Sequence, residues 1–158
     1  MKATTIFKTP LGFTEISGNE EGISSIRIFD QPQPESNEIP IFLIPAVEQI
    51  TAYFNGELEN FNLKLNPEGT PFQKKVWDAL TQIPYGNTMS YLELSQNLGD
   101  IKAIRAVAAA NGKNPLWIVV PCHRVIGSDG SLTGYAGGLW RKKWLLDHEH
   151  PPLQQSLF

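Results

Sequence analysis

Hydrophobic residues follow a β-type pattern in the first part of the chain and a helical pattern later. Short runs rich in β-branched and aromatic residues, such as 12–16, are separated by glycine and proline, which predicts strands over residues 4–29. Three prolines mark 30–40 as a loop. Apolar residues at helical spacing then predict a helix over 45–55.

Residues 61–65 alternate between apolar and polar side chains, as a half-buried strand does. The sequence Asn-Pro-Glu-Gly at 66–69 interrupts this pattern, and we place a domain boundary there. The prediction is an N-terminal domain over 1–69, built from a small sheet and a helix, and a C-terminal domain over 70–158 in which helices dominate. The expected fold class is therefore mixed α/β (α+β).

Two capping-box sequences mark helix starts in the C-terminal half. In each, a hydroxyl residue is followed three positions later by glutamine or glutamate: Thr70 by Gln73, and Ser90 by Glu93. A further helix is predicted over 101–111, where apolar residues keep helical spacing up to a glycine.

The helix expected after Ser90 and the helix over 101–111 are separated by one glycine turn, as in a helix-turn-helix. Small apolar residues on the second helix would allow close packing, while Lys102 and Arg105 on another face could meet DNA. A plain helical hairpin with two solvated charges is the alternative. Spacing alone leaves both interpretations open.

An apolar run over 116–120 predicts a buried strand that leads into Cys122. Turn residues at 128–131 predict a hairpin turn, and the last helix is expected over 139–148. Cys122 is thus predicted at the end of a core strand.

Composition limits the classes of protein to which the chain can belong. Of the 158 residues, 41% are hydrophobic and 18% are charged, which supplies a core and excludes global disorder. No apolar stretch reaches the ~18 residues of a membrane span. The N-terminus lacks the apolar core of a secretory signal, so we expect a cytoplasmic protein.

The net charge of −3 is unevenly distributed along the chain. Residues 1–69 carry four basic residues against ten acids, a balance of −6, whereas residues 70–158 carry nine against six, a balance of +3. Ordinary surface variation would explain this difference. A DNA-facing C-terminal domain beside an acidic N-terminal domain would explain it as well.

Cys122 is the only cysteine in the chain, and His123 follows it directly. A single cysteine excludes an internal disulfide and a cysteine-rich zinc site, so we expect no metal. A lone buried thiol is commonly an inert packing residue. A thiol beside histidine, with glutamate and asparagine available elsewhere, is also the composition of an activated nucleophile.

Several ordered motifs together resemble the methylated-DNA–protein-cysteine methyltransferase family, whose members repair O6-alkylguanine by direct reversal. The motifs that carry the resemblance are, in chain order, Ser90-Tyr91, Arg105-Ala106-Val107, Asn114-Pro115, Pro121-Cys122-His123-Arg124-Val125-Ile126-Gly127, Tyr135-Ala136-Gly137-Gly138-Leu139 and His148-Glu149. The resemblance is close over 70–150 and only architectural over 1–69. It implies a ribonuclease H-like N-terminal domain and a winged helix-turn-helix-like C-terminal domain.

The resemblance implies that Cys122 is the acceptor thiolate, that His123 is its base through an intervening water, and that Glu149 holds the imidazole. On these roles we expect the thiol of Cys122 to titrate below the ~8.5 of a free cysteine. Asn114 would link the helix-turn-helix to the active-site segment. Each of the last two also has a structural alternative: Glu149 as a solvated helix-end acid, and Asn114 as a turn residue before proline.

Family members flip the damaged base out of the duplex, and the resemblance implies which residues assist. Tyr91 would donate its hydroxyl to N3 of guanine, and Arg105 would fill the gap that the flipped base leaves. The other residues implied at the substrate pocket are Val125, Tyr135, Ala136 and Lys142, although Lys142 has the alternative of a solvated surface lysine. Some members carry serine at the position of Ala136, so the resemblance does not settle the preferred size of the alkyl group.

The implied reaction moves the alkyl group from O6-alkylguanine, and from O4-alkylthymine, in double-stranded DNA to Cys122. The product is a thioether, and no second cysteine is present to reopen it, so each molecule acts once. No cofactor is required, and we expect a monomer.

Two other classes of function remain open. Non-catalytic lesion-binding modules share this domain but carry tryptophan where this chain has Cys122. A cysteine hydrolase would combine Cys122 and His123 with asparagine or glutamate, although no oxyanion-hole motif is evident and a helix-turn-helix would have no task in it.

Overall fold

The computed structural model describes residues 2–132, 134–135 and 137–151. Its N-terminal part is an antiparallel meander of three strands, β1 (Ala3–Thr9), β2 (Gly12–Asn19) and β3 (Gly22–Phe29). Gly12 and Gly22 open the second and third strands with φ values of 139° and 136°, which favour glycine. The strands predicted within 4–29 are confirmed.

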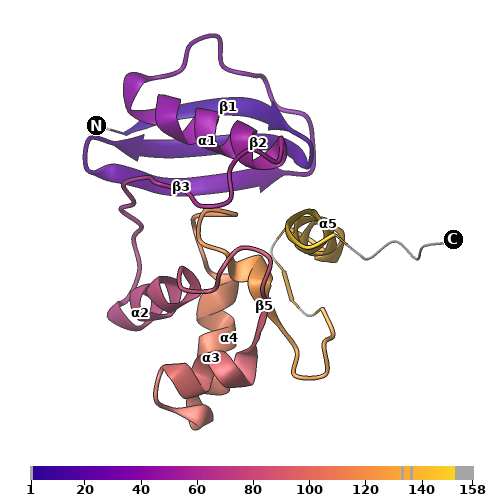
Figure 1. Cartoon of the computed structure of the whole chain (residues 1–158). Helices are drawn as coiled ribbons and strands as arrows, with labels where there is room; N and C mark the ends of the chain where they lie inside the picture. Colours follow the sequence, from indigo (N-terminus) through magenta and orange to yellow (C-terminus); the bar gives the residue numbers. More distant parts are fainter. Residues whose placement is uncertain (1, 133, 136, 152–158) are drawn as a thin grey trace, which may run out of the picture.

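A single helix lies across one face of this sheet (Figure 1). A turn of 3-10 helix, η1 (Ile41–Leu43), leads into α1 (Ile44–Phe54). Ile50 and Tyr53 of α1 share the hydrophobic core with Ile16 of β2, and all three side chains are fully buried. The loop and helix predicted for this part of the chain are confirmed.

Residues 61–65 do not form the predicted strand. Their side chains alternate between half-buried and exposed, as the pattern indicated, but only Leu65 makes a β-bridge, to Ile23 of β3. The bridge consists of hydrogen bonds from Ile23 N to Lys64 O at 2.8 Å and from Asn66 N to Ile23 O at 2.7 Å. Alternation therefore indicated half-burial correctly, whereas a strand also needs a partner along several residues.

Three helices follow in the C-terminal part, α2 (Pro71–Leu80), α3 (Tyr91–Asn97) and α4 (Ile104–Gly112). Both predicted capping boxes are present. At α2, Gln73 N donates to Thr70 Oγ1 at 3.1 Å, and Thr70 N donates to Gln73 Oε1 at 3.0 Å. At α3, Glu93 N and Ser90 Oγ are 3.0 Å apart, and Ser90 N and Glu93 Oε1 are 3.1 Å apart. Each box satisfies backbone N–H groups that the helix itself leaves unpaired.

The predicted pair of helices around a glycine turn corresponds to α3 and α4 (Figure 1). Gly99 makes the turn with a φ of 89°. The second helix begins later than predicted, because η2 (Ile101–Ala103) forms a 3-10 turn before α4. Close packing of α4 on α2 is visible at Ala110, whose carbonyl accepts a hydrogen bond from Trp77 Nε1 at 2.9 Å.

The segment that leads into Cys122 is not a strand, contrary to our prediction. Only Leu116 makes a β-bridge, to Ile26 of β3; residues 117–120 form turns and a bend, and Cys122 begins a turn of 3-10 helix, η3 (Cys122–Arg124). The run is apolar because it is buried between the two domains, and burial alone does not distinguish a strand from tightly packed turns.

Two short strands and one helix complete the C-terminal part. β5 (Val125–Ile126) pairs in parallel with β4 (Met89–Ser90). The predicted turn at 128–131 closes with a hydrogen bond from Gly127 N to Ser131 O at 2.8 Å, but no strand follows it among the described residues. The predicted last helix is confirmed as α5 (Leu139–Glu149).

β3 is also the place where the two domains join. Ile26 N donates to Pro115 O at 2.8 Å, and Trp117 N donates to Ile26 O at 3.3 Å. Arg141 of α5 also contacts the N-terminal domain, where it donates to Leu11 O at 3.0 Å in the turn between β1 and β2. Within the part of the chain that the structure describes, no helix is long and apolar enough to cross a membrane.

Candidate active site

Asn114 fixes the turns that carry Cys122. Its side-chain oxygen accepts from Leu116 N at 2.9 Å, and its amide nitrogen donates to Val120 O at 2.8 Å. The same Val120 carbonyl accepts from Cys122 N at 2.8 Å, which closes a γ-turn centred on Pro121 (φ −81°, ψ 63°). One side chain thus connects the segment that follows α4 to the backbone just before the thiol.

A second γ-turn between these anchors places Ile118 in a strained conformation. Val119 N donates to Trp117 O at 2.8 Å, and Ile118 has a φ of 71°. A positive φ is costly for a β-branched residue, on the order of 1–3 kcal/mol. The Ile118 side chain is 1% exposed, so burial holds it in place and offsets this cost.

A cavity of about 320 Å³ opens beside Cys122. Residues of β3 form one wall, and Asn111, Trp117 and Tyr135 contribute to the others. The thiol residue itself is 7% exposed. A volume of this size lies at the lower end of small-molecule sites, which suits a small organic group or part of a base.

The thiol of Cys122 is not predisposed to ionise, contrary to our expectation. Burial raises the pKa of Cys122, and the opposing influences, first the Asn114 side chain and then the charge of Lys142, do not offset it. A thiolate in this enclosure loses more hydration than these neighbours return. A reaction at this thiol would therefore require a base that takes its proton.

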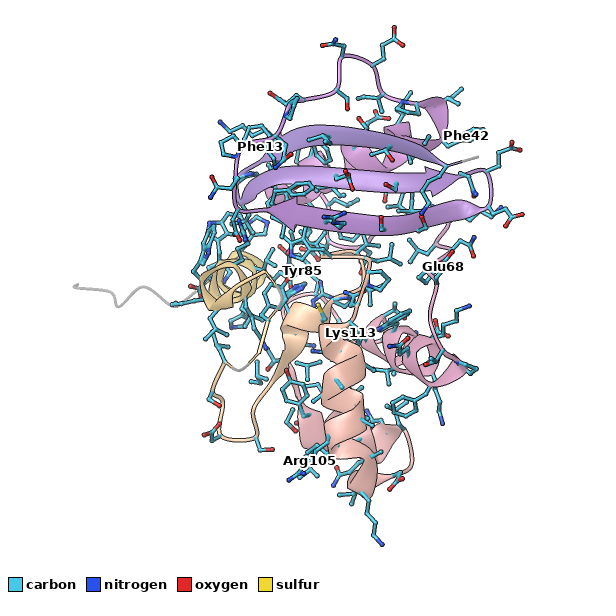
Figure 2. The ribbon with its side chains drawn as sticks, turned by 180° about the vertical axis from the view of Figure 1, so that it is seen from behind. Phe13, Phe42, Glu68, Tyr85, Arg105 and Lys113 are labelled. Carbon is cyan, nitrogen blue, oxygen red and sulfur yellow. The ribbon has the colours of Figure 1, made fainter. Side chains whose placement is uncertain are left out.

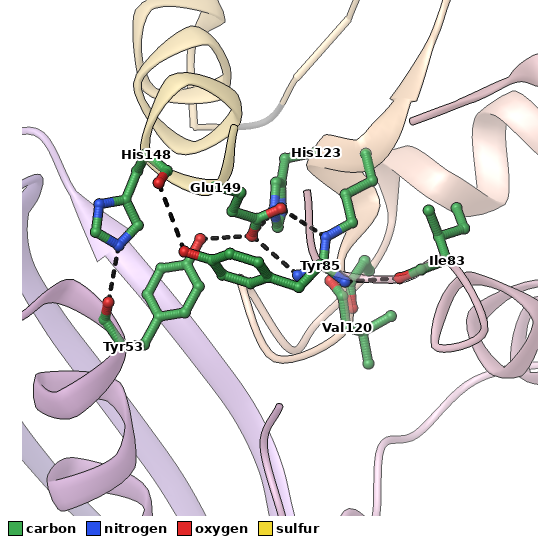
Figure 3. Close-up of polar contacts among 9 residues, drawn as sticks. Tyr53, Ile83, Tyr85, Val120, His123, His148 and Glu149 are labelled. Carbon is green, nitrogen blue, oxygen red and sulfur yellow. Dashed lines mark hydrogen bonds and ion pairs between the residues drawn. The ribbon is translucent and has the colours of Figure 1, made fainter. Parts of the chain in front are cut away.

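His123, the next residue in the chain, has the contacts and protonation state of such a base. Its Nε2 lies 2.7 Å from Glu149 Oε2 (Figure 3). Because the carboxylate is ionised, Nε2 carries the hydrogen and donates it. Burial lowers the pKa of His123 despite the opposing influence of Glu149, so the imidazole is neutral and Nδ1 holds its lone pair. Nδ1 is buried and has no hydrogen-bond partner in the described part of the chain.

Glu149 is held by two further residues that we did not predict. Arg124 donates from Nε to Oε1 at 2.7 Å and from Nη2 to Oε2 at 2.9 Å, and Tyr53 donates its hydroxyl to Oε2 at 2.6 Å. Burial alone would raise the pKa of Glu149, but the hydrogen bonds from His123 and Arg124 outweigh it and lower the pKa to about 2. The carboxylate is therefore charged at any pH near neutrality.

Arg124 and Tyr53 left different signals in the sequence. Arg124 directly follows Cys122 and His123, and a buried arginine needs an anionic partner, so its pairing with a carboxylate could have been anticipated. Tyr53 lies 96 residues before Glu149 along the chain. Nothing in the local pattern of α1 distinguishes this tyrosine from a packing aromatic.

Lys142 and Tyr91, two of the predicted substrate residues, lie close together. Lys142 is fully buried, and this burial lowers its pKa; only an ionised Cys122 would oppose the shift. Its Nζ is 5.8 Å from the centre of the Tyr91 ring. Tyr91 is half-buried and is the first residue of α3, so the capping box of Ser90 sets its position.

The other predicted pocket residues have different places. Tyr135 lines the cavity together with Cys122, and burial raises the pKa of its phenol well above the usual range. Val125 is fully buried in the core and does not line this cavity. Ala136 lies outside the described residues.

Arg105 lies on the exposed side of α4. Figure 2 shows it towards the end of the helical domain that is remote from the sheet. Its neighbour Val107 turns into the core, which leaves the guanidinium to solvent. Arg105 does not line the cavity at Cys122, so any contact with the substrate requires a partner that covers this face.

No group of residues is arranged to bind a metal in the described ranges, since no three histidine, cysteine or carboxylate side chains cluster there. The groups beside Glu149 have protein partners instead. His148 Nε2 lies 2.8 Å from Tyr53 O, and Asp147 accepts from Lys143 Nζ at 2.7 Å.

Two family models match the chain in sequence order. Residues 2–67 match the ribonuclease-like domain of 6-O-methylguanine DNA methyltransferase, and residues 71–151 match its DNA binding domain. A methylated-DNA–protein-cysteine methyltransferase of Methanosarcina acetivorans is 49% identical over 149 residues, which is 91% of this chain and 96% of that protein. Its counterpart in Mycobacterium tuberculosis strain H37Rv is 44% identical over 156 residues, or 95% and 94% of the two chains.

Solved structures agree with these matches. A crystal structure of Mycobacterium tuberculosis O6-methylguanine methyltransferase has a TM-score of 0.85 at 42% identity and covers 99% of this chain and 98% of that one. A crystal structure of Mycobacterium tuberculosis OGT in complex with DNA has a TM-score of 0.84 at 43% identity and covers 92% of each chain. The predicted fold class is confirmed. The chain belongs to the 6-O-methylguanine DNA methyltransferase family.

Proposed function

We propose that this protein repairs DNA by direct reversal, taking the alkyl group of O6-alkylguanine in double-stranded DNA onto Cys122. The observation that carries the proposal is the neutral His123, which donates from Nε2 to Glu149 and presents a free Nδ1 lone pair directly after a buried thiol at a cavity. The relatives of this chain are named for the same transfer.

In the proposed reaction, the Cys122 thiol passes its proton to Nδ1 of His123 through one water. The sulfur forms a bond to the alkyl carbon while the bond from that carbon to O6 breaks, and the electron pair moves into the purine. A proton returned to the purine restores guanine, so protons and electrons balance. Glu149 stabilises the imidazolium that exists between these steps.

DNA is the partner that the family's DNA binding domain and the DNA complex of a relative support. We assign Arg105 on the exposed side of α4 to the gap left by a flipped base, because a flipped base costs a few kcal/mol of stacking that a side chain can partly replace. We assign the Tyr91 hydroxyl to N3 of guanine and Asn114 to the link between α4 and Cys122.

The remaining assignments follow from the same reaction. Tyr135, Val125, Ala136 and Lys142 would surround the substrate, and O4-alkylthymine would be accepted beside O6-alkylguanine. The thioether product is permanent, so each molecule would act once, as a monomer in the cytoplasm. We divide the chain into an N-terminal domain over 1–69 and a C-terminal domain over 70–158.

Intact-mass analysis after incubation with O6-methylguanine duplex DNA tests the proposal. The mass should rise by that of one methyl group minus that of the thiol hydrogen it replaces. Each molecule should accept one methyl group, with no turnover. Cys122→Ser is the control: a serine hydroxyl is a far weaker nucleophile, so it should show no mass increase while DNA binding is retained.

Other outcomes would identify the competing classes. Tight lesion binding by the wild type without a mass increase would make the protein a non-catalytic lesion-binding module. Repeated turnover of ester or peptide substrates, lost in Cys122→Ser, would make it a hydrolase. Methyl transfer by Cys122→Ser at the wild-type level would remove Cys122 from the site.

A further inference from the structure

Tyr53 connects the N-terminal domain directly to the residues that move the proton. Its hydroxyl donates to Glu149 Oε2 at 2.6 Å, across 96 residues of sequence. Figure 3 shows the phenol coming from α1 on one side of the carboxylate, while His123 approaches from the other. The Tyr53 side chain is fully buried, so this hydrogen bond is shielded from water.

The phenol has little freedom to leave this position. Its ring stacks on Phe61 with centroids 5.4 Å apart, and it meets the edge of Tyr85 at 6.1 Å. His148 Nε2 lies 2.8 Å from the Tyr53 carbonyl. The last turn of α5 therefore contacts Tyr53 at both ends, through His148 at the backbone and through Glu149 at the hydroxyl.

Three groups contact the same oxygen of Glu149. Oε2 lies 2.6 Å from the Tyr53 hydroxyl, 2.7 Å from His123 Nε2 and 2.9 Å from Arg124 Nη2. Donors that share one oxygen also share its negative charge, so each weakens the pull of the carboxylate on the others. The number of donors therefore controls how strongly Glu149 stabilises a protonated His123.

Resting on the proposed function, we propose that Tyr53 is a positioning residue for alkyl transfer. Its phenol holds Glu149 against His123 and moderates the basicity of the imidazole, so the N-terminal domain completes the proton relay. Arg124 alone would keep the carboxylate ionised, but it divides its hydrogen bonds between the two oxygens. The Tyr53 hydroxyl is directed at Oε2 only and therefore competes most directly with His123 for the charge of that oxygen.

The groups around the proton relay determine in which direction the pKa of His123 changes when the Tyr53 hydroxyl is removed. The titratable and charged groups that face it in the described part of the chain are Tyr53 of α1, Tyr85 before β4, Cys122 and Arg124 of η3, Tyr135 before α5, and Lys142 of α5. Burial and Glu149 raise the pKa of the Tyr53 phenol far above its usual range, so it donates at every working pH. Without this donor, Oε2 concentrates more charge on His123, which then holds a proton up to a higher pH.

Tyr53→Phe tests the proposal by single-turnover methyl transfer from duplex DNA, followed by intact mass between about pH 5 and pH 9. The variant should react roughly tenfold more slowly at the plateau, the effect of one lost hydrogen bond to a charged group. The acid limb of its pH–rate profile, where the rate falls as the pH is lowered, should move to higher pH by roughly half a unit, because a protonated His123 cannot act as base. A ring-based NMR titration of His123 should show the same shift.

Tyr85→Phe is the matched control. Tyr85 belongs to the same aromatic cluster, and its hydroxyl lies 3.5 Å from the His148 carbonyl rather than on the carboxylate. We expect its acid limb to coincide with that of the wild type. The proposal is overturned if the acid limb of Tyr53→Phe coincides with that of the wild type. It is also overturned if Tyr53→Phe and Tyr85→Phe shift the acid limb equally. Failure of the wild type to accept a methyl group would instead refute the proposed function.

A second variant keeps the ring and the hydroxyl in case Tyr53→Phe does not fold. Incorporation of 3-fluorotyrosine at position 53 makes the phenol more acidic and therefore a stronger donor. The acid limb should then move to lower pH, opposite to the shift in Tyr53→Phe. An unmoved limb in the folded fluorinated protein overturns the proposal as well.

Discussion

Glu149 is the residue on which the site depends, because four donor atoms from three side chains converge on one buried carboxylate. Tyr53, His123 and Arg124 come from two different domains, and each brings a hydrogen to an oxygen between 2.6 and 2.9 Å away. Such a buried cluster is stable only while every member keeps its charge state. The direction in which pH changes the stability contributed by this cluster can therefore be predicted.

Acid should weaken the fold through Glu149. Its pKa falls from 4.5 to about 2 on folding, so its contribution is fully present above about pH 4.5 and is lost as the pH falls toward 2. The shift corresponds to roughly 3 kcal/mol. Urea unfolding at stepped pH should show a smaller loss of unfolding free energy in Glu149→Gln than in the wild type over this window.

Glu48→Gln provides the control for this series, because Glu48 is an exposed carboxylate on α1. It should follow the wild-type pH dependence. A Glu149→Gln profile parallel to that of the wild type would show that Glu149 does not carry the acid sensitivity.

At the scale of elements, the cap of α3 positions Tyr91, which we assign to the substrate. Ser90 accepts from Glu93 N at 3.0 Å, and the next residue, Tyr91, begins the helix. The position of the Tyr91 ring therefore depends on where α3 starts. A cap made by the sequence itself thus contributes to the geometry of the site.

Ser90→Ala should lower the free energy of unfolding by about 1 kcal/mol, the usual effect of losing an N-cap hydroxyl. Chemical denaturation measures the loss. Ser128→Ala, in an exposed turn, should change stability by a few tenths of a kcal/mol at most, in line with ordinary surface substitutions. Equal effects at both positions would mean that the cap contributes nothing.

Arg105 illustrates a second feature of the same helix pair, a charge left on the outer side of α4. Arg105→Ala should impair methyl transfer from duplex DNA more than the reaction with free O6-benzylguanine, if the cavity accepts that base. A free base needs no gap filled in a duplex. The ratio of the two rate constants is the measurement.

Lys113→Ala removes one exposed positive charge near the other end of α4 and serves as the control for Arg105→Ala (Figure 2). It should lower duplex affinity through charge alone and leave the transfer step from bound duplex unchanged. Equal losses on duplex and free base in Arg105→Ala would assign Arg105 to the fold or the chemistry.

For the whole molecule, Arg141 is a further polar connection between the domains, besides the backbone hydrogen bonds at Ile26. Its guanidinium donates to Leu11 O at 3.0 Å and to Asp30 at 2.7 Å in the N-terminal domain, and to Gly137 O at 2.8 Å within its own domain. Arg141 is buried, whereas the Asp30 side chain is 81% exposed. The carbonyl contacts, and not the ion pair, should therefore dominate its effect on stability.

Arg141→Gln should destabilise the protein by about 2 kcal/mol or more, because it leaves buried carbonyls without charged donors. Asp30→Asn should cost less than about 1 kcal/mol, as exposed ion pairs do. Thermal and urea unfolding of both variants compares the two. A larger loss in Asp30→Asn would show that the ion pair is the connection.

The sequence alone determined the local elements and led to a prediction of the reacting residues. Capping boxes, glycine turns and periodicity act within a few residues, so the helices from Thr70 and Ser90 and the strands within 4–29 could be predicted. Cys122, His123, Asn114 and Glu149 were recognised as an ordered set. Local patterns did not predict the γ-turns around Ile118, because burial there comes from the other domain.

Only the tertiary structure decided the electrostatics of the site. Burial raises the pKa of Cys122 where adjacency to His123 suggested the opposite, because the loss of hydration depends on everything packed around the thiol. Tyr53 reaches Glu149 only because α1 and α5 pack together across the domain boundary. Contacts between residues far apart in sequence depend on the packing of the whole chain, which local sequence patterns do not predict.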